Sequence, residues 1–106
     1  MAWVYLIIAG VLEIVWAVAM KQSDGLTRLG HVAIMVVAMI GSVTLLALAM
    51  RSLPLGTAYM IWTGIGALGA FAVGILFLGE GLTMPRLLAA LLITAGMVLM
   101  KLSATE

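Results

Sequence analysis

The chain has 106 residues, of which 66% are hydrophobic and 8% are charged, and its formal net charge is +1. A soluble domain of this size needs more polar surface than this composition supplies, so water is excluded as its main solvent. The sequence has no basic stripe to meet the phosphates of a nucleic acid, and it has no cysteine for disulfides or thiolate metal sites.

Four apolar segments separate the charged residues, and a helix needs roughly 20 residues to cross a bilayer. We expect helices over residues 2–20, 30–50, 55–78 and 84–101. The last is uncharged only between residues 87 and 100, so it spans the membrane if Arg86 and Lys101 extend toward opposite interfaces, or if the membrane thins locally. The sequence therefore predicts one all-α integral membrane domain, residues 1–106, with four transmembrane helices.

The connections between these segments are short and carry signals that end or begin helices. The first segment lacks the basic start and cleavage site of a signal peptide, and Asp24-Gly25 forms a turn after it. Pro54 disfavours helical geometry at the residue before it. Thr83 is a candidate N-cap, and Pro85 fits the first turn of the last helix. Short connections predict an up-down-up-down order of neighbouring helices.

The basic residues are divided almost evenly between the two sides of this predicted bundle. Arg51 and Lys101 fall on one side, whereas Lys21, Arg28 and Arg86 fall on the other. Orientation in the membrane follows the excess of Lys and Arg, so a difference of one residue hardly specifies it. The pattern favours insertion in both orientations, with a single, weakly biased orientation as the alternative.

Glu13 is the one acid inside the apolar segments. A charge near the middle of a span costs roughly 2.5–3.5 kcal/mol on insertion scales, so Glu13 must face protein or a watery cavity. The basic residues stand at helix ends, which leaves Glu13 without an expected ion-pair partner. Gly10 and Trp16 share its helix face; the glycine leaves room, and the indole supplies an N–H donor and a π-face. These residues predict a functional carboxylate that binds cations and protons.

The third segment carries aromatic residues and glycines at helical spacing. Tyr59 and Trp62 lie one turn apart, and Gly66 continues the same face. With Trp16 they can wall a site for a planar or quaternary cation, although aromatics near a span's end also form interfacial belts. Gly64 and Gly66 permit a bend or simply close packing.

Two further features of the spans have competing interpretations. Ser42 is a polar residue in an apolar stretch, and taken alone it is expected to bond back to a carbonyl of its own helix. Four short helices enclose little volume around Glu13, which favours a dimer. The fourth helix contains small residues that suit close helix contact between protomers or, equally well, within one protomer. These are Ala89, Ala90, Ala95 and Gly96.

These residues together resemble a known family over essentially the whole chain. The resemblance rests on Trp3, Gly10, Glu13, Trp16, Lys21, Ser23 and Gly25-Leu-Thr-Arg28, followed by Leu53-Pro-Leu-Gly-Thr-Ala-Tyr59-Met-Ile-Trp62-Thr-Gly-Ile-Gly66. The chain is similar to the small multidrug resistance transporters. Trp16 and the run from Gly56 to Gly66 resemble the guanidinium exporter subtype, whereas Ala90 stands where the family often has glycine.

The resemblance implies an antiparallel, dual-topology homodimer in the bacterial inner membrane that exports guanidinium ions in exchange for protons. Glu13 is then the shared proton and substrate carboxylate, and Tyr59 lines the site. Its implied hydrogen-bond partners are Trp16, Ser42 and Trp62, and its implied pocket-shaping residues are Gly10, Gly64 and Gly66. No cofactor is implied. The sequence has no ATP-binding loop, catalytic triad or metal cluster, so an enzyme is not expected.

Three alternatives use the same residues differently. A pump for hydrophobic quaternary ammonium cations would use the same acid. A passive proton or cation channel would need no counter-substrate, but no polar stripe runs through all the helices. A structural or regulatory membrane subunit would tolerate replacement of Glu13.

Overall fold

The computed structural model describes residues 1–103. It contains four helices, α1 (Ala2–Gln22), α2 (Leu29–Ala49), α3 (Leu55–Phe77) and α4 (Met84–Leu102). All four are long and apolar enough to cross a membrane. The prediction of four membrane-spanning helices is confirmed, and each helix ends within two residues of its expected end.

The sequence signals between the helices form tight connections. After α1, the Ser23 hydroxyl donates to the Met20 carbonyl oxygen at 2.6 Å and accepts from the Leu26 N–H at 3.0 Å. Asp24 and Gly25 have φ angles of 52° and 73°, in the left-handed region that reverses the chain. At the start of α4, the predicted Thr83 cap is confirmed, because its hydroxyl accepts from the Arg86 N–H at 3.4 Å.

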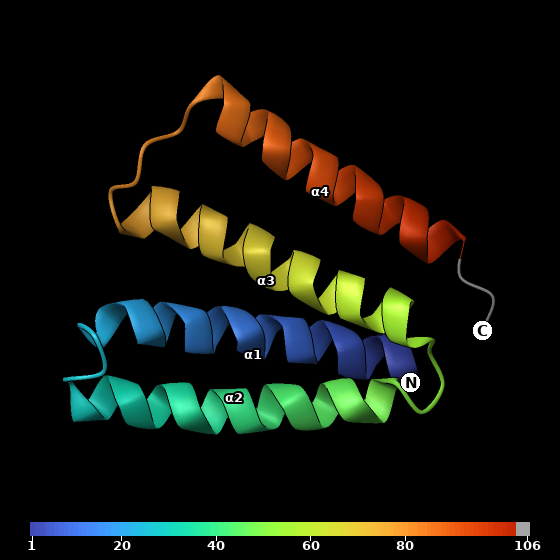
Figure 1. Cartoon of the computed structure of the whole chain (residues 1–106), viewed down its shortest axis with the longest axis horizontal. Coiled ribbons are helices and arrows are strands. Elements are labelled where there is room, and N and C mark those ends of the chain that lie inside the picture. The colour runs from blue at the N-terminus through green and yellow to red at the C-terminus, as the bar shows by residue number, and fades with distance from the viewer. Residues whose placement is uncertain (104–106) are drawn as a thin grey trace.

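The helices alternate in direction, and α1 is the central one. It packs against α2 on one side and against α3 on the other, so that α2 and α3 hardly meet (Figure 1). Within residues 1–103, the backbone of α4 approaches only α3. The α1–α2 and α3–α4 connections lie at one end of the molecule, and the N-terminus and the α2–α3 connection lie at the other (Figure 1).

A small core joins the first three helices near the N-terminal end of α1. Fully buried Ala9, Ala49 and Ala58 let the helix backbones approach closely. The rest of the core comprises Leu6, Leu46, Leu53, Ile61 and Trp62. By contrast, no residue of α4 is buried. The fourth helix therefore leaves nearly its whole surface for lipid or another chain.

Two basic side chains bracket α4. The Arg86 guanidinium donates from Nη1 to the Gly81 carbonyl oxygen at 3.2 Å, back in the α3–α4 connection. At the other end, the Lys101 Nζ lies 4.0 Å from the centroid of the Trp3 ring, a cation–π contact with α1. Both charges thus stay at the ends of the helix and leave its middle apolar.

Candidate functional site

Ser42 joins three helices through one hydroxyl group. It donates to the carbonyl oxygen of Ala9 in α1 at 2.6 Å and accepts from the Trp62 indole Nε1–H of α3 at 2.9 Å. Ser42 is 0% exposed, and both bonds are buried. The expected bond to its own helix is therefore wrong, because the close packing of α1 on α2 turns Ser42 toward α1 and gives its hydroxyl a better partner.

The Glu13 carboxyl group lies against Gly66 of α3. A Cβ atom on Gly66 would overlap the Glu13 Oε1 and Cδ atoms, so only glycine fits beside the acid in this arrangement. Glu13 Oε1 is buried and has no hydrogen-bond partner among residues 1–103. The carboxyl group thus occupies the contact between α1 and α3 with one acceptor unmatched.

The Ser42 bonds and the Glu13 contact lie close together along the same helix pair. Ala9 precedes Glu13 by one helical turn, and Trp62 precedes Gly66 by one turn. The two sets of contacts are therefore about 5.4 Å apart along the helix axes. The structure thus brings Ser42 and Trp62 within about one helical turn of Glu13, but neither bonds its carboxyl group, because Ser42 donates to Ala9 and Trp62 donates to Ser42.

Trp16 lies one turn beyond Glu13 on α1. Its Nε1–H is also buried and without a hydrogen-bond partner in the part of the chain described. Leaving a buried donor or acceptor unmatched costs about 1–3 kcal/mol, so most proteins avoid it. The unmatched acceptor on Glu13 and the unmatched donor on Trp16 are therefore both free to bind a ligand or water.

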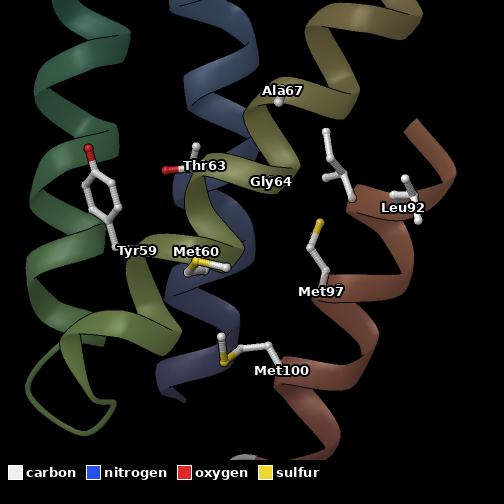
Figure 2. A pocket seen from close by; sticks show the side chains of 10 residues that line it. Tyr59, Met60, Thr63, Gly64, Ala67, Leu92, Met97 and Met100 are labelled. Carbon is white, nitrogen blue, oxygen red and sulfur yellow. The ribbon is translucent and has the colours of Figure 1, made fainter. Parts of the chain in front are cut away.

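Tyr59 is placed at the margin of this site. Its ring centroid lies 5.4 Å from that of Trp62, with an angle of 51° between the rings, but the residue is 51% exposed. It lines a cleft of about 470 Å³ between α3 and α4, where Met97 and Met100 of α4 face α3 (Figure 2). Glu13, Trp16 and Ser42 do not line this cleft.

The three predicted pocket-shaping glycines have different neighbours. A Cβ on Gly10 would lie 2.6 Å from Ile65 Cγ2 of α3, and one on Gly64 would lie 2.5 Å from the Met97 sulfur of α4. Of the three, Gly66 is the one against Glu13. Sequence reasoning missed two participants, the Ala9 carbonyl and Ile65. The small residues Ala9 and Gly10 indicate a helix contact there, but nothing local identifies its partner.

Comparison with known proteins places the chain in a family. The family model for the Small Multidrug Resistance protein matches residues 1–93. Proteins of Citrobacter freundii and Salmonella typhimurium, each called Guanidinium exporter, are 53% identical over 97% of this chain and 98% of their own. A Yersinia pestis protein of the same name is 52% identical over 98% of this chain and 100% of its own. This multi-pass membrane protein belongs to the Small Multidrug Resistance family of transporters.

Proposed function

We propose that this protein exports guanidinium ions across the bacterial inner membrane in exchange for protons, and that both ions bind in turn to the Glu13 carboxylate. The observation that carries the proposal is the Oε1 atom of the Glu13 carboxyl group, which is buried and has no hydrogen-bond partner within residues 1–103. Relatives 53% identical to this chain are called guanidinium exporters, which supports the choice of cation.

The chemistry of the site suits a planar cation. Guanidinium presents parallel pairs of N–H groups, and a carboxylate accepts two of them at once. Trp16, one turn from Glu13, and Trp62, whose ring contacts that of Tyr59, are aromatic residues near this carboxylate, and aromatic rings attract cations. The unmatched Trp16 Nε1–H is a donor that can orient the carboxylate.

Competition for one carboxylate couples the two ions. A proton and a guanidinium ion neutralise the same negative charge, so they exclude each other from Glu13. A carrier with a bare carboxylate must move an unpaired charge through a desolvated barrier, which is costly. Exchange of conformations therefore requires a bound proton or a bound cation, and the proton gradient sets the direction of export.

An antiparallel homodimer completes this mechanism. The exposed surface of α4 leaves room for a second copy, and the near-even division of basic residues supports its insertion in the opposite orientation. When two such copies exchange conformations, the dimer becomes its own inverted image. Without ligands, the inward-open and outward-open states of the dimer then have equal free energy. Neither state is favoured over the other, so the proton gradient alone sets the direction of transport.

The test is exchange in proteoliposomes with guanidinium as the substrate across a pH step. Glu13→Gln keeps the size of the side chain but removes its charge, and we expect it to abolish exchange while the protein stays folded. Asp24→Asn, which neutralises an exposed acid in the α1–α2 connection, is the control and should transport normally. Retained pH-dependent guanidinium exchange by the Glu13→Gln variant would contradict this mechanism.

A second candidate is export of hydrophobic quaternary ammonium cations by the same acid. The apolar cleft of about 470 Å³ beside Tyr59 favours it, because such a cleft can hold alkyl groups. Exchange assays with tetraalkylammonium and with guanidinium, each as the sole substrate, distinguish the two. Proton-coupled exchange of tetraalkylammonium alone would favour this candidate.

A further inference from the structure

A second cavity, of about 300 Å³, lies between the C-terminal part of α1 and the end of α3. Two oppositely charged residues line it, Lys21 in the last turn of α1 and Glu80 in the α3–α4 connection. The C-terminal end of α1 and the α3–α4 connection lie at the same end of the molecule, together with the α1–α2 connection (Figure 1). The charged part of the cavity is therefore at the membrane surface.

The other end of this cavity approaches Glu13. Ala17 and Ala67 are among its lining residues. Ala17 lies one turn after Glu13 on α1, and Ala67 directly follows Gly66, against which the Glu13 carboxyl group packs. The cavity therefore begins at charged residues near the surface and reaches to about 5.4 Å, one helical turn, from the Glu13 contact.

The backbone at the end of α3 directs Glu80 into this cavity. The N–H groups of Leu78 and Glu80 both donate to the Gly74 carbonyl oxygen, at 3.2 and 3.0 Å, and Gly79 adopts a φ of 72° between them. The Glu80 carboxyl group folds back over the buried Gly74, where a Cβ would lie 2.7 Å from Glu80 Cδ. Glycine at position 74 thus keeps the carboxylate over α3.

The Glu80 carboxylate is available to a cation. In the part of the chain described, it makes neither an ion pair nor a side-chain hydrogen bond, although Lys21 lines the same cavity. The carbonyl groups at the end of α3 carry the negative end of the helix dipole, which adds to the attraction of a cation.

We propose that Glu80 is an outer capture site, which holds the transported cation weakly at the membrane surface before the cation passes between Ala17 and Ala67 to Glu13. Lys21 opposes this capture, because it repels the cation and competes with it for Glu80. The inference rests on the proposed function and adds a second carboxylate to the path. Because the cation meets Glu80 before Glu13, Glu80 affects the apparent affinity for the cation. The maximal transport rate at saturating cation depends on Glu13 instead.

The experiment compares guanidinium exchange by wild type, Glu80→Gln and Asp24→Asn in proteoliposomes at low and high ionic strength. Asp24 is the matched control, an exposed acid at the same end of the molecule that does not line the cavity. We expect Glu80→Gln to raise the KM for guanidinium about fivefold at low salt, to lose this effect at high salt, and to leave the maximal rate unchanged. Asp24→Asn should leave both parameters at the wild-type values.

Two further variants separate position from charge. Gly74→Ala keeps the Glu80 charge but displaces the carboxylate, so it should raise the KM as Glu80→Gln does. Lys21→Gln should lower the KM. Equal KM values in Glu80→Gln and Asp24→Asn would overturn the inference even if Gly74→Ala failed to fold. Absence of guanidinium exchange in the wild type would instead overturn the proposed function, so the two failures are distinguishable.

Discussion

The Ser42 hydroxyl donates a hydrogen bond to α1 and accepts one from α3, so its removal should weaken the packing of both helices. Ser42→Ala leaves the Ala9 carbonyl and the Trp62 Nε1–H without their shared partner. We expect a loss of about 1–2 kcal/mol in the free energy of unfolding, measured by denaturant titration of the detergent-solubilised protein. Thr44→Ala is the control, because the Thr44 hydroxyl bonds to the Ile40 carbonyl of its own helix at an exposed position. Equal stabilities of the two variants would contradict the bridging role.

Trp16 and Trp62 each have a buried indole N–H group, and the loss of that group should affect the two residues differently. Trp16→Phe removes a donor that has no partner within residues 1–103, so we expect unchanged stability and weaker guanidinium exchange. Trp62→Phe removes the bond to Ser42, so its stability should fall as in Ser42→Ala. Thermal unfolding and exchange assays on both variants check this. Normal exchange by Trp16→Phe would exclude its N–H from the site.

At the scale of elements, the contact between α1 and α3 depends on which glycine is replaced. Gly66→Ala forces a methyl group onto the Glu13 carboxyl group, whereas Gly64→Ala meets the flexible end of Met97. We expect Gly66→Ala to lower exchange at least tenfold, because small displacements of a reacting group are costly in rate. Gly64→Ala on the same helix should retain most of the activity. The opposite ranking in the exchange assay would contradict the placement of Glu13 against Gly66.

The helices could be predicted from the sequence because their signals are local. The spacing of charged residues sets the spans, and Pro54 and Thr83 mark helix starts by their own backbone and side-chain chemistry. The Ser42 bond could not be predicted, because its partner is 33 positions away and depends on how α2 rotates against α1. Tyr59 could be predicted only in part for the same reason. Its spacing from Trp62 indicates that the two rings are in contact, but its exposure depends on where α4 packs.

On the scale of the whole molecule, the packing of α4 differs from that of the other helices. The contacts of α4 with the rest of the chain include Met97 beside Gly64, Met100 beside Thr57 and Lys101 over Trp3, all in its C-terminal half. Farther toward the N-terminal end of α4, Ala89 and Ala90 line a cleft of about 250 Å³ against α3. A helix attached at one end in this way leaves its other half free to pack against a second copy in the proposed dimer.

The orientation of the chain should respond to a single added charge. The basic residues stand at three on the side of the α3–α4 connection and two on the other. Leu82→Lys, at an exposed position in that connection, makes the ratio four to two, so that side should stay in the cytoplasm. Arg28→Ser combined with Ser52→Lys and Ser103→Lys, two exposed positions on the opposite side, makes the ratio two to four and should invert the chain.

The orientation of the chain can be measured with two reporters fused after the fourth helix. One reporter is active only in the cytoplasm, and the other is active only outside it. We expect both reporters to be active on the wild type and on Leu82→Gln, the uncharged control, and one reporter on each charged variant. If the working unit is an antiparallel dimer, each charged variant alone should lose guanidinium exchange. Expression of the two charged variants together should restore exchange, because chains of opposite orientation are then present in one membrane. Full exchange by either variant alone would exclude the antiparallel dimer as the required unit.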